Sequence, residues 1–243
     1  IFTIEKPYNG PPCSLSVPVE YGPFTEDEKR FYRYAISRLS AFSNVWWDLG
    51  NEHTEYRDVE WGNKMGRFVK VHDAHKRLTS VHAYSEWLYG DADWADFIII
   101  QQIGSPKELN SLVLNYRSIR KPYVNEECGY MLNEPDLLRR IHWLISVAGG
   151  YATTGDAAHD EYAFYTGHVG GGGGGSQLKI IREFFEALPY WEMTSRNDLV
   201  SEDAFCLAKP SRIYVIYIPQ TRILERVRGE ETVGQATRRE ERY

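Results

Sequence analysis

Residues 97–101 read Phe-Ile-Ile-Ile-Gln and decide the fold class of this chain. The run is short and apolar without alternation, which is typical of a strand that is buried on both faces. Such strands belong to parallel sheets whose faces are covered by helices. Amphipathic stretches typical of helices flank the run on both sides, so the sequence predicts an α/β protein with a parallel sheet.

The same alternation of strands and helices extends over the chain up to residue 190. Further strands are predicted at 1–4, 45–49, 80–84, 122–126 and 148–154. Helices are predicted at 25–42, 60–78, 106–120, 134–147 and 177–188, with a short helix before residue 97. This pattern predicts a (β/α)8 TIM-barrel type of fold. The barrel is expected to be incomplete, because about six βα units are visible and a closed barrel needs eight.

The character of the sequence changes after Pro189. Two β-type runs, 204–208 and 213–218, predict a hairpin, and the chain is charged and weakly periodic from Thr221 onward. We therefore expect a barrel region at 1–190. The remainder, 191–243, is expected to be the start of a small β-rich region and a charged tail.

A run of six glycines, Gly170–Gly175, interrupts the predicted barrel region and is followed by Ser176. A phosphate-binding loop needs a Lys or Ser at a set spacing, which this run lacks. Its composition instead predicts a flexible linker at 170–176.

Composition excludes several function classes. The formal net charge is −6, which argues against binding to nucleic acid or to a membrane surface, since both depend on basic patches. Three distant cysteines are too few for a disulfide scaffold or a four-cysteine zinc site. We see neither a signal peptide nor an apolar run that could span a bilayer. No dinucleotide-binding or phosphate-binding glycine motif follows a strand.

The first candidate motif is the stretch NVWWDLGNEH, which begins at Asn44. Asn51 and Glu52 directly follow a predicted buried strand, where chemistry gathers in a barrel. The Asn amide can hold a sugar hydroxyl, and the Glu can act as a general acid and then as a base. A helix cap is an equally good explanation of this pair when it is taken by itself.

The second candidate motif is KPYVNEECGY, residues 121–130. Side chains alternate along a strand, so its two adjacent acids cannot both face the core. We expect Glu127 to project into the barrel mouth, while Glu126 either supports it or turns outward. A solvated loop acid is the alternative. Together with Glu52, this acid would supply the two carboxyl groups that retaining glycosidases hold about 5–5.5 Å apart.

Four segments, NVWWDLGNEH, TSVHAY, KPYVNEECGY and AGGYATTGD, occur in this order and resemble the glycoside hydrolase TIM barrels of the large retaining clan. More narrowly, they resemble bacterial glycosidase-like families that end in a collagen-binding-type β-domain, a group that includes apiosidase-like enzymes. The resemblance covers roughly residues 24–219. It implies a retaining glycosidase that acts on a carbohydrate substrate and that is secreted or periplasmic.

By this resemblance, Glu52 is the acid/base and Glu127 is the nucleophile. The residues that it implies for substrate binding are Asn51, His82, Tyr84, Gln101 and Tyr151. Strands one and two of the barrel are not visible in the sequence. A partner chain or an oligomer would therefore be needed to complete the barrel.

Two alternatives to a glycosidase stay open. The chain could be a non-catalytic carbohydrate-binding or scaffold fragment, or a metal-dependent hydrolase whose histidines converge in the barrel mouth. His72 and His75, together with His53 and His82, could suggest a metal, but the pair lacks the H-E-x-x-H zinc pattern. We therefore expect structural or surface histidines, no metal and no cofactor. Cys128 is expected to be a small packing residue rather than a nucleophile, because no base partner is visible in the sequence.

Overall fold

The computed structural model describes residues 24–55, 57–83, 86–126, 128, 135–153 and 174–219. It confirms a mixed α/β fold with parallel strands. The strands are β1 (Trp47–Asp48), β2 (Thr79–Ser80), β3 (His82–Ala83), β4 (Ile98–Ile100), β5 (Tyr123–Asn125), β6 (Tyr151–Ala152), β7 (Thr194–Ser195), β8 (Phe205–Lys209) and β9 (Ile213–Tyr217). The helices are α1 (Glu26–Leu39), α2 (Val59–His72), α3 (Pro106–Asn115), α4 (Pro135–Val147) and α6 (Gly174–Glu186), with short 3-10 turns η2 (His53–Glu55), η3 (Arg117–Ile119), η4 (Tyr190–Glu192) and η5 (Asn197–Leu199).

Strands β1 to β6 follow one another in space in the order in which they follow along the chain. β1 pairs with β2, and β3, β4, β5 and β6 pair in that order, all parallel. β2 and β3 are two parts of one extended segment that is interrupted at Val81. A doubly wound sheet reverses its strand order at a switch point, and this order has no reversal in the described residues. The strand predicted at 1–4 lies outside them.

Helix boundaries follow local hydrogen bonds. Thr25 caps α1 and accepts a bond from the backbone of Glu28 (3.2 Å). The helix predicted to run to residue 78 ends at His72, because the Asp73 carboxylate accepts bonds from two following backbone N–H groups and from the Trp47 indole (2.8 Å). The backbone N–H groups of His75 and Arg77 thus bond to a side chain instead of to helix carbonyl groups, and α2 ends before them.

The short helix predicted before residue 97 is wrong, since residues 86–96 contain no helix. Aromatic packing explains the irregular path of this segment. Tyr89 and Trp94 are buried against α2 at Gly62 and Gly66, where a side chain of any size would collide with the two rings. The resulting contacts require the segment to lie flat on the helix.

Towards the C-terminus the predicted hairpin is confirmed as β8 and β9, and β7 adds a third antiparallel strand. Helix α6 begins at Gly174, so the last two glycines of the predicted linker are helical. The other glycines of the run and the predicted tail beyond residue 220 lie outside the described residues. In the described part of the chain, no helix is both long and apolar enough to cross a bilayer.

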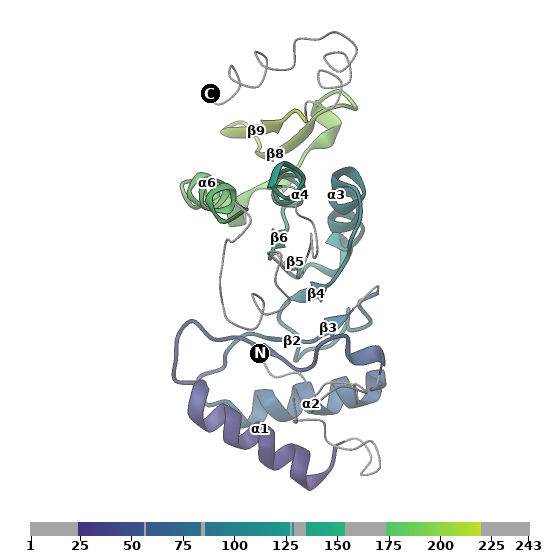
Figure 1. Ribbon diagram of the computed structural model, residues 1–243, viewed down its shortest axis with the longest axis vertical. Helices are drawn as coiled ribbons and strands as arrows, with labels where there is room; N and C mark the ends of the chain where they lie inside the picture. Colours follow the sequence, from purple (N-terminus) through teal and green to yellow (C-terminus); the bar gives the residue numbers. More distant parts are fainter. Residues whose placement is uncertain are drawn as a thin grey trace.

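One face of the parallel sheet, here called the helix face, packs against α1, α2, α3 and α4. Figure 1 shows α1 and α2 at one end of the molecule and α3 and α4 farther up, with strands between them. The buried side chains of this core include Val81, Ala83, Ile98 and Ile100 from the strands and Tyr32, Ile36, Trp61, Met65, Leu109, Val113, Ile141 and Ile145 from the helices.

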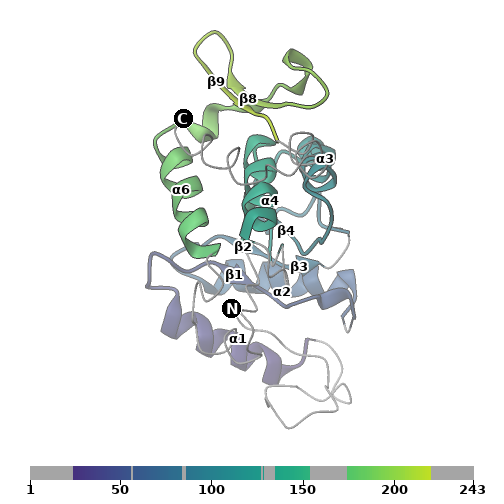
Figure 2. The ribbon, with the colours of Figure 1, turned by 45° about the horizontal axis from the view of Figure 1, so that its top comes forward.

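Helix α4 also contacts the C-terminal sheet. Its Leu144 and Val147 are buried in a second cluster with side chains of α6, β8 and β9. Trp143 of the same helix stacks on Tyr217 of β9, with ring centroids 5.6 Å apart and planes nearly parallel. Figure 2 shows α4 between α3 and α6, with β8 and β9 beyond them. The parallel and antiparallel sheets therefore share one helix as a packing surface.

Candidate active site

Polar side chains gather on the other face of the parallel sheet. Side chains two positions apart along a strand, and partners in register, share a face. His82 pairs with Ile99 of β4, and Gln101 lies two residues beyond Ile99. The strand register and the two-residue period also place Asp48 of β1 on this face, together with Glu126, which directly follows β5. We call the face with Asp48, His82, Gln101 and Glu126 the site face.

Three of these side chains converge at the carboxyl end of the strands. His82 Nδ1 lies 3.8 Å from Asp48 Oδ2 and 3.9 Å from Glu126 Oε2. One oxygen or nitrogen from each residue lies within 4.8 Å of the others. Asp48 and His82 are buried, and Glu126 is nearly so. The cluster is thus a buried group of two acids around one imidazole.

The Asp48 carboxyl group is held by backbone donors. Its Oδ1 accepts bonds from the N–H of His82 (3.0 Å) and of Gly50 (3.3 Å). Burial raises the pKa of Asp48 to about 6, although these two bonds act to lower it. Its second oxygen, Oδ2, is the one directed at the His82 ring.

The His82 ring is neutral at neutral pH. Burial lowers the pKa of His82 to about 4, and the neighbouring Gln101 side chain acts in the opposite direction. No bond between the two meets hydrogen-bond geometry. Among the described residues, His82 Nε2 and Gln101 Oε1 are therefore buried polar atoms without a hydrogen-bond partner. Such atoms are rare in folded proteins, and a bound water, ion or ligand is a common explanation for them.

His53 fixes the loop that follows β1. Its ring is fully buried, with Nδ1 2.8 Å from the carbonyl oxygen of His82 and Nε2 2.6 Å from the Tyr89 hydroxyl. Because a carbonyl only accepts, Nδ1 donates to it and Nε2 accepts from Tyr89. Burial lowers the pKa of His53, which keeps the ring in this neutral form. The residue before it, Glu52, has a left-handed backbone (φ 44°) and is half-buried.

The sequence-predicted residues have different outcomes. Asn51 and Glu52 lie at the carboxyl end of β1, the end where the cluster forms, and both are half-buried. Glu127 and Tyr84 lie outside the described residues, so both stay predictions. Tyr151 is half exposed and packs edge-to-face on Tyr190, with ring centroids 5.4 Å apart.

Sequence reasoning missed Asp48 and left the direction of Glu126 open. The two-residue period of side chains along a strand could have placed both. It puts Asp48 on the other face of the sheet from the buried Trp47, and it puts Glu126 on the same face as Val124. His72 and His75 are exposed, which agrees with the expectation of structural or surface histidines.

Cys128 is a buried packing residue, as predicted, but it does have a basic neighbour. Its Sγ lies 3.1 Å from the Thr153 carbonyl oxygen and 3.6 Å from His142 Nε2. Burial raises the pKa of the thiol well above its usual range and lowers the pKa of His142 to about 4. Both groups are therefore neutral, which does not suit a thiolate nucleophile.

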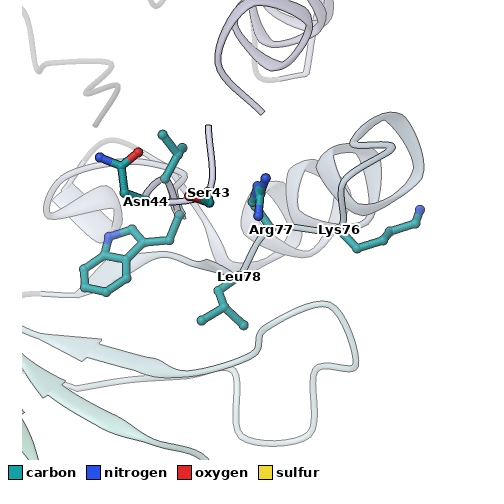
Figure 3. A pocket seen from close by; sticks show the side chains of 7 residues that line it. Ser43, Asn44, Lys76, Arg77 and Leu78 are labelled. Carbon is teal, nitrogen blue, oxygen red and sulfur yellow. The ribbon is translucent and has the colours of Figure 1, made fainter. Parts of the chain in front are cut away.

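A separate hollow of about 330 Å³ lies at the opposite end of the strands. It is lined by the residues that precede β1 and β2, namely Ser43, Asn44, Val45, Trp46, Lys76, Arg77 and Leu78. Figure 3 shows these side chains around the opening. The Arg77 guanidinium is bound to the carbonyl oxygens of Ser40 and Ala41, and Lys76 Nζ is bound to that of Lys70. The two cations are thus satisfied by the protein backbone.

The sequence matches no protein-family profile and no curated protein. Two solved structures from Bacteroides vulgatus ATCC 8482 have a similar fold. One is provisionally described as a glycoside hydrolase (TM-score 0.58, 21% identity, 76% of this chain and 40% of that one). The other is a glycoside hydrolase of family 5 (TM-score 0.58, 14% identity, 79% of this chain and 54% of that one). The chain thus has a glycoside hydrolase-like fold and spans about half the length of these proteins or less.

Proposed function

We propose that this chain is part of a glycoside hydrolase and that the site face binds and cleaves its carbohydrate substrate. The observation that carries the proposal is the meeting of Asp48, His82 and Glu126 at the carboxyl end of the parallel strands. Catalytic groups of (β/α)8 barrels gather at this end. A buried acid with a raised pKa, such as Asp48, also suits acid–base chemistry.

The proposed barrel uses β1, the combined β2–β3 segment, β4, β5 and β6 as its strands four to eight. Their sequential order without reversal supports this assignment. The helices on one face and the polar side chains on the other also agree with a barrel wall. The resemblance to apiosidase-like families belongs to the proposal as well.

Within this site, Glu52 is the proposed acid/base and Glu127 the proposed nucleophile. Glu52 would protonate the leaving oxygen while Glu127 attacks the anomeric carbon, and Glu52 would then activate water to release the sugar. The fixed position of the Glu52 loop supports its role, because His53 ties that loop to the backbone of β3. Glu127 directly follows Glu126, which faces the cluster.

Sugar hydroxyl groups are the proposed partners of Asn51, His82, Tyr84, Gln101 and Tyr151. A hydroxyl both donates and accepts hydrogen bonds, so it can satisfy buried polar atoms of either kind. His82 Nε2 and the Gln101 side chain are the best supported of this set, because each has a buried polar atom without a protein partner among the described residues.

The test is hydrolysis of a panel of 4-nitrophenyl glycosides by the wild type and three variants. Glu127→Ala is expected to lower kcat by at least 10⁴-fold, as the loss of a nucleophile does. Glu52→Ala is expected to spare these reactive substrates relative to an unactivated disaccharide, because nitrophenolate leaves without protonation. The control is Glu202→Ala, an exposed acid in the C-terminal region, which should keep full activity. Full activity of Glu127→Ala would disprove the nucleophile assignment.

Sodium azide separates the two roles. Added azide should restore turnover of both variants, giving a glycosyl azide of inverted configuration with Glu127→Ala and of retained configuration with Glu52→Ala. NMR of the products distinguishes the two. If the wild type binds oligosaccharides in calorimetry but cleaves none of the panel, the chain is a carbohydrate-binding fragment instead.

A further inference from the structure

The spacing of the Asp48–His82–Glu126 cluster is unusual for side chains that only contact one another. The separations of 3.8 and 3.9 Å from His82 Nδ1 to the two carboxylates are too long for hydrogen bonds. Ligand atoms around a divalent cation, with bonds of about 2.0–2.2 Å, lie roughly 3–4 Å apart. The three atoms lie within 4.8 Å of one another, so the gap between them is compatible with the spacing of ligands around one such ion.

The burial of the two acids also agrees with a bound cation. Asp48 is 7% exposed, and the Glu126 side chain is 15% exposed. The His82 ring lies between the two acids, with Nδ1 near one oxygen of each. Buried carboxylates are stable when they are paired or coordinate a metal. A divalent ion at this position would bind one oxygen of each acid.

The groups around the cluster are arranged as metal sites require. The backbone N–H groups of Gly50 and His82 bind Asp48 Oδ1, which leaves Oδ2 directed at the gap. Orientation of a ligand by such outer bonds is typical of metal sites. Gln101 lies beside Glu126 in register and offers a buried Oε1 that has no donor among the described residues.

We propose that Asp48 Oδ2, His82 Nδ1 and Glu126 Oε2 bind one first-row divalent cation, Zn²⁺ or Mn²⁺. One imidazole among oxygen ligands suits these ions better than Ca²⁺ or Mg²⁺, which prefer oxygen alone. The ion joins the carboxyl ends of β1, β3 and β5. It leaves His82 Nε2–H and the Gln101 side chain available to a substrate.

Calorimetry tests the site on the full chain after treatment with EDTA and removal of the chelator. We expect about one Zn²⁺ or Mn²⁺ per chain, with much weaker binding of Ca²⁺. Glu126→Gln should lower the affinity at least tenfold and leave the melting temperature in EDTA unchanged. The control is the double variant His72→Gln/His75→Gln, which removes the exposed histidine pair at the end of α2 and should leave binding unchanged. Unchanged affinity in Glu126→Gln, or loss of binding in the control, would overturn the proposal.

A second measurement needs no variant. X-ray absorption at the zinc edge of the loaded wild type should show one imidazole nitrogen and otherwise oxygen ligands. Two or more imidazoles, or none, would overturn the assignment. Neither experiment depends on turnover, so a failure of the metal site and a failure of the glycosidase proposal can be told apart.

Discussion

The two faces of the parallel sheet carry side chains of opposite character on the same short strands. The helix face is apolar and closely packed, with Ile98 and Ile100 of β4 fully buried under α-helices. The site face begins with a small apolar patch of Phe97, Ile99 and Val124 and ends in acids and an imidazole. The helix face thus carries most of the apolar packing of the strands. The carboxyl end of the site face holds buried polar groups instead.

The largest expected effect is a loss of stability on the helix face. Ile100→Ala should lower the free energy of unfolding by about 2–5 kcal/mol, because it leaves a cavity between β4 and the helices. Urea denaturation monitored by tryptophan fluorescence measures the change. The matched control is Ile103→Ala, whose side chain is half exposed and should cost less than about 1 kcal/mol. Equal losses for the two variants would break the distinction between the faces.

The second prediction concerns His142 of α4, a buried titratable group on the helix side of the sheet. Burial lowers the pKa of His142 from 6.5 to about 4 in the folded protein. The contribution of neutral His142 to the free energy of unfolding is therefore complete above pH 6.5. It is lost as the pH falls towards 4, by at most about 3 kcal/mol, because the unfolded chain binds the proton more readily. His142→Leu should flatten the pH dependence of the unfolding free energy in this window. A variant with the wild-type slope would show that His142 is not buried in its neutral form.

The smallest effect on stability is expected on the site face. Asp48→Asn keeps an oxygen for the Gly50 and His82 N–H groups and removes a buried charge. The unfolding free energy should change by less than about 1 kcal/mol or increase, while activity on aryl glycosides falls. Denaturation and kinetics on the same sample measure both. A loss of stability as large as that of Ile100→Ala would mean that the site face also holds the fold together.

The fold class could be predicted from the sequence because the periodicity of the strands and helices is strong. The run at 97–101 gave β4, and the helices differ from their predicted ranges mainly at their ends. The ends of the helices depend on tertiary contacts, which the periodicity of the sequence does not predict. The Asp73 carboxylate stops α2 partly by binding the indole of Trp47, which lies 26 residues earlier in the chain.

The candidate site could be predicted only in part. The acid-rich strand ends were visible in the sequence, but the convergence of Asp48 and Glu126 on His82 depends on the register between three strand segments. Register is set by pairing in space, and a shift of one residue would turn each side chain to the other face. The buried contact between Cys128 and His142 was missed for the same reason, since it joins a strand end to α4.

Helix α4 has a consequence for how the molecule unfolds. Its Leu144 and Val147 are covered by the C-terminal sheet, while Ile141 and Ile145 are covered by the parallel one. If either sheet separated from α4, apolar side chains of this helix would become exposed to water, and the other sheet packs on the same helix. The two regions should therefore lose their structure in one cooperative transition, and cutting the chain near Pro189 should yield two pieces that are both less soluble than the whole.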